Sequence, residues 1–381
     1  MVIRQALLDR LRKALSRSPI VMLVGPRQCG KTTLAKQLMS EGAGRYFDLE
    51  HHGTAEQLAE PALALQDLKG LVVLDEAQRQ PVLFPQLRVL ADRSRRQARF
   101  LVLGSASPEL ARQASESLAG RVEIIEVRGF DTSEVPEKRQ SNLWLRGAFP
   151  RSFLAKSNEA SLTWRNDFIT TFLERDLGNL GFGISPVALR RFWRMLAHYH
   201  GQQWNADQMS TALGISASSA RNYVDALEQT YMVRRLQPWF INTKKRLVKA
   251  PKVYLRDTGL LHAMEGIGTM DALHSHPIIG ASWEGFAVEE VLSAFKPREA
   301  WYYATHNGAE LDLFFLHKGK RIGVEIKRTT APTITRSMQV ALEDLKLDKL
   351  YFLYPGTLMA KLAAKVEALP ISHLREAEGK A

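Results

Sequence analysis

The chain has 381 residues, of which 45% are hydrophobic and 24% are charged, a composition typical of globular proteins with packed cores. No apolar run approaches the roughly 20 residues that a membrane-spanning helix requires, and the single cysteine, Cys29, excludes a disulfide within the chain, so we expect a cytoplasmic protein of two or three domains. The net charge of +12 favours a polyanionic partner, although a basic surface without any partner would have the same charge.

Residues 1–135 alternate short β-rich runs with longer helical patterns. The β-rich runs lie at 20–25, 45–50, 70–77, 99–107 and 122–130. Repeated strand–helix units predict an α/β fold with a parallel sheet and helices on both faces. The polar segment 131–142, which contains Pro136, predicts a domain boundary.

The segment GPRQCGKTT, residues 25–33, follows an apolar strand and opens a helix, and it matches the pattern G-x-x-x-x-G-K-[ST]. Glycines let consecutive backbone N–H groups point inward around phosphate oxygens, and the helix N-terminus adds its positive end. Lys31 would contact the β- and γ-phosphates of ATP, and the Thr32 hydroxyl would ligate Mg²⁺. A glycine-rich turn without a ligand is the alternative. The predicted nucleotide-binding residues are Gly25, Pro26, Arg27, Gln28, Cys29, Gly30, Lys31, Thr32 and Thr33.

Acidic residues end the strand in LVVLDEAQRQ, residues 71–80. Ligands bind at the carboxyl ends of strands in an open parallel sheet, so we expect Asp75 to hold Mg²⁺ through water and Glu76 to orient the attacking water. Ser105, at the end of the next strand, is a candidate sensor of the γ-phosphate or part of a simple turn. Arg121 is a candidate γ-phosphate arginine, so the predicted catalytic residues are Lys31, Glu76 and Arg121.

Residues 143–270 are mainly helical and contain a helix-turn-helix pattern. A helix over 206–213 meets a turn at Gly214, and a second helix begins at the Ser216 cap and carries a buried stripe of Ala220, Val224 and Leu227. Two candidate wing strands follow, separated by a basic segment. In that segment we expect contact with a nucleic-acid backbone, or a solvated wing as the alternative, from Lys244, Lys245, Arg246, Lys249 and Lys252. Because helix-turn-helix units also bind proteins, sequence-specific reading of DNA does not follow.

Residues 278–370 change character again. A helix over 282–295 leads to three strands, then a helix over 335–345 and a strand over 349–356, and the polar tail after 371 is expected to fray. In RIGVEIKR, residues 321–328, Glu325 and Lys327 share one face of a strand. On the preceding strand Asp312 could converge with Glu325, and Glu284 of the leading helix is placed to point inward.

Together these segments resemble prokaryotic AAA-type ATPases that carry a C-terminal domain of the DUF4143 family. The matching segments include VGPRQCGKTTLAKQL, VVLDEAQ, TFLERDL, YMVRRLQPWFIN, GASWEGFAVEEVL and VEIKR, in the same order over nearly the whole chain. The resemblance implies a P-loop AAA-type ATPase domain at 1–135, a helical winged-helix domain at 143–270, and an α/β domain similar to PD-(D/E)xK (restriction-endonuclease-like) nucleases at 278–370.

A nuclease site of that kind needs a metal held by hard oxygens and a lysine near the attacked phosphate. The resemblance therefore implies metal ligation by Glu284, Asp312 and Glu325, with Lys327 as the catalytic lysine. The chain departs from the pattern at Gly308-Ala309-Glu310, where the usual proline before the first acid is missing. The alternative is a buried, salt-bridged cluster that only stabilises the domain.

The leading hypothesis is a cytoplasmic, Mg²⁺-dependent ATPase that couples ATP hydrolysis to a nucleic-acid transaction. A second hypothesis is an ATP-dependent switch that binds a protein partner, with an inactive nuclease-like domain. A third is an ATP-regulated, metal-dependent nuclease. The choice among DNA, RNA and a protein as partner, and the oligomeric state, stay open.

Overall fold

The computed structural model describes residues 2–42, 44–93, 97–104, 114, 116–179, 182–240 and 248–380. Two compact units make up the chain. The first comprises Met1–Gly129, Arg175–Gly183 and Gln229–Tyr231, and the second comprises Phe130–Glu174, Ile184–Glu228 and Met232–Ala381.

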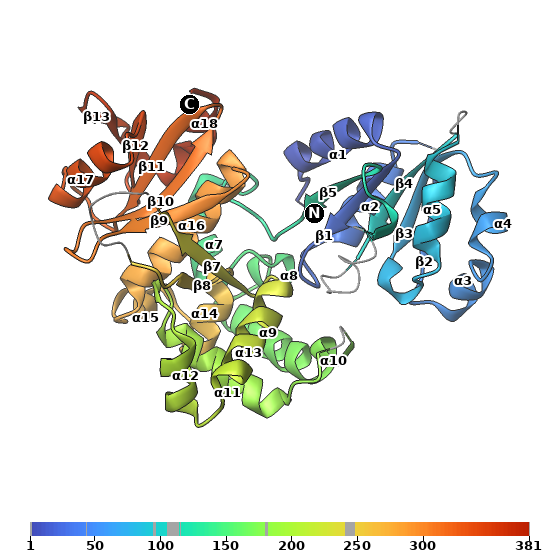
Figure 1. The fold of residues 1–381 in the computed structure, drawn as a ribbon, viewed down its shortest axis with the longest axis horizontal. Coiled ribbons are helices and arrows are strands. Elements are labelled where there is room, and N and C mark those ends of the chain that lie inside the picture. Colours follow the sequence, from blue (N-terminus) through green and yellow to red (C-terminus); the bar gives the residue numbers. More distant parts are fainter. Residues whose placement is uncertain are drawn as a thin grey trace. The chain divides into compact units, whose positions relative to one another are not determined.

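The first unit is built on a parallel five-stranded sheet in the order β2-β3-β4-β1-β5 (Figure 1). Its strands are β1 (Ile20–Val24), β2 (Gly44–Asp48), β3 (Gly70–Asp75), β4 (Ala98–Leu103) and β5 (Val122–Glu126). Its helices are α1 (Gln5–Arg17), α2 (Lys31–Met39), α3 (His52–Gln57), α4 (Pro61–Leu65), α5 (Leu83–Ala91) and the short α10 (Leu177–Asn179). The five predicted strands are confirmed.

Helices cover both faces of this sheet, as the repeated strand–helix pattern predicts. On one face Leu11 of α1 and Leu34 of α2 pack with Val73 of β3. On the other face Phe84 of α5 packs with Val72, and all of these side chains are almost fully buried. Consecutive residues of β3 therefore enter opposite cores, which is why the strand reads as a continuous apolar run.

The second unit combines a helical part with a nine-stranded mixed sheet in the order β13-β14-β12-β11-β10-β9-β7-β8-β6. The strands are β6 (Gln202–Gln203), β7 (Val233–Pro238), β8 (Lys252–Leu255), β9 (Ala300–Ala304), β10 (Glu310–His317), β11 (Lys320–Ile326), β12 (Lys349–Tyr354), β13 (Ala360–Ala363) and β14 (Val366–Pro370). The predicted wing strands β7 and β8 join the C-terminal strands through a parallel β7–β9 pair.

The helices of this unit follow the sequence pattern closely. They are α7 (Gln140–Arg146), α8 (Pro150–Phe153), α9 (Asn158–Thr171), α11 (Pro186–His198), α12 (Ala206–Leu213), α13 (Ala217–Gln229), α14 (Thr258–Met264), α15 (Met270–His274), α16 (Ile279–Phe295), α17 (Arg336–Asp344) and α18 (Leu374–Lys380). Short 3₁₀ turns lie at Glu137–Arg139 and Ile371–His373 of this unit and at Ala77–Arg79 of the first unit, and a π-helical turn lies at Phe172–Asp176. The predicted domain 278–370 and most of the predicted domain 143–270 belong to this compact unit, and the division between them stays a prediction.

The helix-turn-helix prediction is confirmed in its local geometry. Between α12 and α13 the chain turns at Gly214, whose φ of 67° lies in the left-handed region. The predicted buried stripe of α13 is present: Ala220, Val224 and Leu227 are fully buried. Among the residues that the structure describes, no helix has the length and apolar character needed to cross a bilayer.

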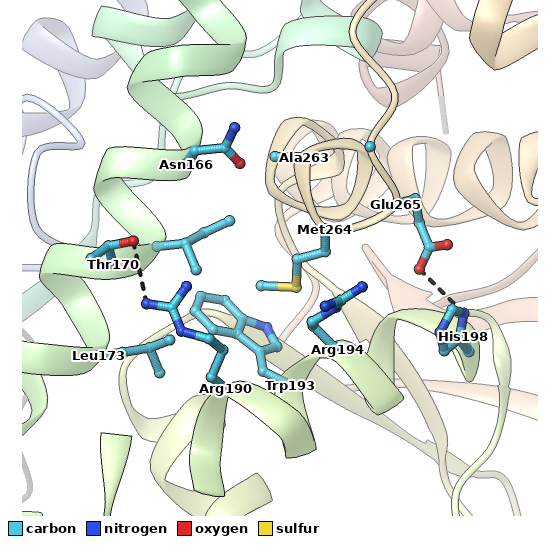
Figure 2. Close-up of a pocket in the computed structure, with 12 residues that line it drawn as sticks. Asn166, Thr170, Leu173, Arg190, Trp193, Arg194, His198, Ala263, Met264 and Glu265 are labelled. Atoms are coloured by element: carbon cyan, nitrogen blue, oxygen red, sulfur yellow. Dashed lines mark hydrogen bonds and ion pairs between the residues drawn. The ribbon is translucent and has the colours of Figure 1, made fainter. Parts of the chain in front are cut away.

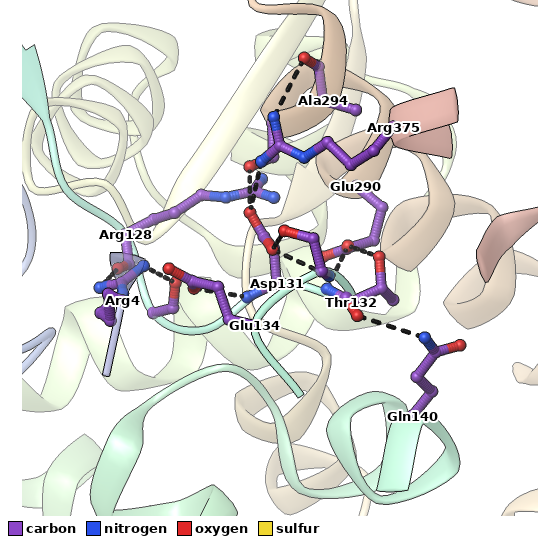
Figure 3. Close-up of polar contacts among 12 residues, drawn as sticks. Arg4, Arg128, Asp131, Thr132, Glu134, Gln140, Glu290, Ala294 and Arg375 are labelled. Carbon is purple, nitrogen blue, oxygen red and sulfur yellow. Dashed lines mark hydrogen bonds and ion pairs between the residues drawn. The ribbon is translucent and has the colours of Figure 1, made fainter. Parts of the chain in front are cut away.

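The prediction that the tail after residue 371 frays is wrong. Leu374 and Ala377 of α18 are buried, because their spacing places both on the side that faces α16. Arg375 donates hydrogen bonds to Asp131 Oδ2 at 3.1 Å and to the carbonyl of Ala294 at 3.4 Å (Figure 3). Two apolar residues and one arginine thus anchor a segment that is otherwise polar.

Candidate functional site

The phosphate loop of the first unit connects β1 to α2, and two glycines set its shape. Gly25 has a φ of 152°, and a Cβ there would lie 2.0 Å from the carbonyl oxygen of Val127. Gly30, the residue before α2, has a left-handed φ of 99°. Larger residues at these positions would move the backbone, so the glycines of the motif are needed for the loop itself.

Lys31 and Cys29 lie inside the loop. The Lys31 ammonium donates to the carbonyl oxygens of Gly25 at 3.0 Å and Pro26 at 2.8 Å and is only 7% exposed. The buried Cys29 thiol donates to the Val127 carbonyl at 3.2 Å. The ammonium therefore lies against the loop backbone, while the thiol has a packing role.

Asp75, at the carboxyl end of β3, is the centre of a hydrogen-bond network. Its Oδ2 accepts from the Thr32 hydroxyl at 2.7 Å and from the Tyr46 hydroxyl at 2.6 Å. The backbone N–H of Glu76 donates to its Oδ1 at 3.0 Å. Burial and the neighbouring Asp75 carboxylate raise the pKa of Tyr46 well above its usual value, so the phenol remains a donor. The Thr32 hydroxyl and the Asp75 carboxylate offer the oxygen ligands that Mg²⁺ prefers, and their contact fits the predicted metal position.

Tyr46 was not among the predicted site residues. It lies on β2, which pairs in parallel with β3 so that Tyr46 is beside Val73. The run RYFDLE predicted the strand but not its neighbour, because strand order is a tertiary property. The only sequence signal for a role of Tyr46 in the site is its hydroxyl, two residues before the end of a predicted strand.

Glu76 immediately follows this network in an unusual conformation. Its φ of 55° is left-handed, a conformation that costs a residue other than glycine on the order of 1–3 kcal/mol. The Gln78 side-chain amide donates to the Glu76 carboxylate. Such strain at the end of the site strand aims the Glu76 carboxylate independently of Asp75, in keeping with a separate role for each acid.

Two further predicted residues differ in their outcome. Arg121 binds Asp92 through two hydrogen bonds of 2.6 and 2.9 Å, so its role at a γ-phosphate stays a prediction. Ser105 lies outside the described residues. Arg27 of the loop pairs with buried Asp176, a partner that sequence reasoning missed even though Asp176 lies in the segment TFLERDL.

In the second unit, the predicted acids of the C-terminal part come together. We use the name acidic cluster for Glu284 of α16, Glu310 and Asp312 of β10, and Glu325 of β11. The pairing of Leu313 with Val324 places Asp312 across from Glu325. Lys327 Nζ lies 3.0 Å from Glu325 Oε1 and 3.7 Å from Asp312 Oδ2.

The cluster contains a second lysine, Lys252, which was predicted to contact a nucleic-acid backbone; that prediction is wrong, because its side chain is only 6% exposed and contacts acids. Lys252 Nζ, from β8, lies 3.0 Å from Glu284 Oε1, 2.5 Å from Glu310 Oε1 and 3.6 Å from Asp312 Oδ1. The Tyr254 hydroxyl also donates to Glu284 Oε1, at 2.6 Å. Nothing local marks Lys252, because it is one of several lysines in a basic segment, 58 positions before Glu310.

The acidic cluster does not fit a divalent metal. A dication about 4 Å from an ammonium would be repelled by roughly 8 kcal/mol at an effective dielectric of about 20. Glu284 Oε1, an oxygen that such a metal would need, already accepts from Lys252 and Tyr254. Among the described residues, no three His, Cys, Asp or Glu side chains are arranged to hold a metal ion.

Two other features complete the description. Of the predicted nucleic-acid contacts, Lys249 is exposed, while Lys244, Lys245 and Arg246 lie outside the described residues. A pocket of about 540 Å³ lies between α9, α11 and the end of α14 (Figure 2). Its α11 wall is basic and contains Arg190, which donates to the Thr170 hydroxyl, and His198, which lies 3.3 Å from Glu265.

Comparison with known proteins gives consecutive matches along the chain. A family model described as an AAA domain matches residues 17–136. Two domains of unknown function follow: DUF8612 matches residues 137–271 and DUF4143 matches residues 279–374. The AAA match covers the phosphate loop and all five strands of the first sheet, and the DUF4143 match covers the acidic cluster but not Lys252.

Two mycobacterial relatives match almost the whole chain. Uncharacterized proteins of Mycobacterium bovis and of Mycobacterium tuberculosis (Rv2008c) are each 49% identical over 365 residues, which is 96% of this chain and 83% of the relative. Among solved structures, the Walker-type ATPase PABY2304 of Pyrococcus abyssi is 15% identical, with a TM-score of 0.46, over 70% of this chain and 96% of that chain.

Proposed function

Because the chain belongs to the family of AAA-domain proteins that end in a DUF4143 domain, we propose that it is a Mg²⁺-dependent ATPase that couples ATP hydrolysis to a nucleic-acid transaction. The P-loop NTPase fold of the first unit supports nucleotide binding at residues 25–33. The observation that carries the proposal is the 2.7 Å contact between Thr32 and Asp75, which joins the loop to the acidic end of β3.

Each side chain of this site has a separate task. The loop N–H groups and Lys31 bind the phosphates, and Thr32 and Asp75 hold Mg²⁺, which neutralises charge on the phosphate oxygens when bound. Tyr46 fixes the orientation of the Asp75 carboxylate through its hydrogen bond. Glu76 orients the attacking water, and Arg121 remains the candidate for added positive charge at the γ-phosphate.

Lys31→Ala tests the enzyme assignment. We expect ATP turnover to fall to background, because the substitution removes the ammonium that contacts the phosphates. Lys13→Ala, an exposed lysine of α1 in the same unit, is the matched control and should retain full activity. Unchanged turnover in well-folded Lys31→Ala protein would exclude this site.

The nucleic-acid part of the proposal rests on charge. The net charge of +12 and exposed Lys249, beside the helix-turn-helix, support contact with phosphate backbones. ATPase assays with and without single- and double-stranded DNA test it. Severalfold stimulation is expected, and indifference to every polynucleotide would contradict it.

A cytoplasmic ATP-dependent switch that binds a protein partner is the second candidate function. The lysine-filled acidic cluster favours it, because a domain that lacks a usable metal site is better suited to docking than to cleavage. An ATP-regulated nuclease has less support. It would require Mg²⁺- or Mn²⁺-dependent cleavage that disappears in Asp312→Ala while ATPase activity is retained.

A further inference from the structure

We infer that Lys252 is the resident cation of the acidic cluster, and that its ammonium takes the place that a divalent metal would have in a nuclease of the implied kind. The cluster is then a metal-free ionic contact that ties β8 to α16 and β10. This inference does not depend on ATP hydrolysis in the first unit.

The geometry around the ammonium supports this assignment. Its three carboxylate neighbours, Glu284, Glu310 and Asp312, come from two elements far apart in the sequence and lie within 3.6 Å of Nζ. A lysine ammonium has three donors and no acceptor, so Glu284 and Glu310 lie at hydrogen-bonding distance, while Asp312 adds charge at 3.6 Å. The Tyr302 ring, 5.6 Å from Nζ, adds a cation–π contact.

Lys252 has no room to withdraw from the cluster. Its side chain is only 6% exposed. Its strand, β8, pairs with both β7 and β6, and Val253, Tyr254 and Leu255 are almost fully buried. Moving the ammonium would leave the largely buried Glu284 carboxylate without its lysine counterion, which is costly inside a protein.

The remaining acid has an environment of its own. Glu325 is almost buried; its Oε1 contacts Lys327, and its Oε2 has no hydrogen-bond partner among the described residues. Lys327 contacts Glu325, as Lys252 contacts the other three acids. The four acids therefore surround two ammonium groups, which weakens their attraction for a dication.

The chemical consequence is that removal of the ammonium should create a metal site. Lys252→Ala removes the ammonium that Glu284, Glu310 and Asp312 now contact, so their oxygens can turn toward one shared cation. Oxygen ligands of this kind bind Mn²⁺ and Mg²⁺. The same three carboxylates should therefore change from lysine binding to metal binding through a single substitution.

Mn²⁺ titration of the nucleotide-free full chain, followed by electron paramagnetic resonance, tests the inference. The Asp312→Asn single variant should bind the same number of Mn²⁺ ions as the wild-type protein. Lys252→Ala should gain one bound Mn²⁺ per chain, and Lys252→Ala/Asp312→Asn should lose it again. Any Mn²⁺ bound elsewhere is common to all variants and cancels in these comparisons.

Two results would overturn the inference: Mn²⁺ binding in the wild type that Asp312→Asn abolishes, or a folded Lys252→Ala protein that gains no Mn²⁺. Thermal unfolding adds an independent readout, since Mn²⁺ should raise the midpoint of Lys252→Ala and not that of the wild type. If Lys252→Ala fails to fold, Lys252→Met replaces it in the titration, because methionine preserves the side-chain volume without the charge. The comparison of the wild type with Asp312→Asn still shows whether the natural cluster binds Mn²⁺.

Discussion

The Tyr46 hydroxyl is a single group whose removal separates metal positioning from phosphate binding. It donates to the same Asp75 oxygen as Thr32. Tyr46→Phe deletes one such hydrogen bond, a contribution of about 0.5–1.5 kcal/mol. We expect ATP turnover at limiting Mg²⁺ to fall about two- to tenfold and the Mg²⁺ concentration for half-maximal turnover to rise.

Steady-state assays across a Mg²⁺ series measure this effect. Tyr223→Phe makes the same chemical deletion in the second unit, where the Tyr223 ring packs on Phe192, and it should leave the Mg²⁺ dependence unchanged. If Tyr46→Phe and the wild type share one Mg²⁺ dependence, the tyrosine has no part in positioning Asp75.

His262 gives the second unit a pH dependence whose sign follows from its contacts. Its Nδ1–H donates to the Leu145 carbonyl at 2.9 Å, so Nε2 accepts from the Ser282 hydroxyl at 2.7 Å, and Ser282 Oγ accepts from Trp144 Nε1. This chain fixes a neutral imidazole. Burial lowers the pKa of His262 from 6.5 to about 4, and burial lowers the pKa of His200 to about 3.

Acid should therefore destabilise the second unit through these two histidines. Between pH 6.5 and about 4 the unfolded histidine binds a proton that the folded one does not, so stability is full above pH 6.5 and falls as the pH drops. The free energy of unfolding falls by about 1.4 kcal/mol per pH unit for each such histidine. His262→Gln should remove roughly half of the pH dependence of the unfolding free energy that these two histidines cause.

Urea unfolding at pH 7 and pH 5 measures that slope. Tryptophan fluorescence reports on the second unit alone, because all 7 tryptophans of the chain lie in its segments. The control is His274→Gln on α15, an exposed position that should leave the slope as in the wild type. Equal slopes for His262→Gln and the wild type would contradict the assignment.

The turn from β1 into α2 depends on Gly25 as a structural element. A Cβ at this position would meet the Val127 carbonyl at 2.0 Å, and the φ of 152° is unfavourable for other residues. We expect Gly25→Ala to displace the loop and weaken ATP binding by at least about tenfold, or about 1.4 kcal/mol. Gly42→Ala, where a Cβ meets nothing within 4 Å, is the control. Calorimetric ATP titration compares the two, and equal affinities would contradict the expected role of Gly25.

Structural elements that depend on residues close together in the sequence were predictable. The strand–loop–helix unit around residues 20–39 was predictable because its apolar run, glycine spacing and helix start are all contiguous. Asp75 and Glu76 were predictable for the same reason, since acids that follow an apolar strand emerge at the ligand edge of a parallel sheet. The helix-turn-helix followed from Gly214 and the buried stripe of α13.

Contacts between distant segments were not predictable in this way. Tyr46 reaches Asp75 only because β2 pairs with β3, and Lys252 reaches the acidic cluster only because β8 and β10 belong to one sheet. The sequence pattern identified the acids but not the lysine among them, so it left the choice between a metal site and a salt-bridged cluster open. Likewise, two apolar residues spaced three apart outweighed the polar composition of α18.

The charge of the whole chain leads to a prediction that no single residue carries. A net charge of +12 attracts polyanions by releasing their counterions, so affinity for DNA should fall as salt rises. We expect at least about a tenfold loss between roughly 50 and 200 mM salt, which corresponds to about two or more phosphate contacts. Fluorescence anisotropy with labelled single- and double-stranded DNA gives the slope of log affinity against log salt.

The effect of single substitutions on that slope separates the nucleic-acid-coupled ATPase from the protein-binding switch. Lys249→Glu reverses one exposed charge beside the helix-turn-helix and should reduce the slope by about one contact if this segment binds the backbone. Lys13→Glu changes the net charge equally at the exposed face of α1 and should have a smaller effect. Equal effects of the two substitutions would mean that DNA responds only to overall charge. In that case the coupling of ATP hydrolysis to nucleic acid loses its structural basis, and the protein-binding switch becomes the better account.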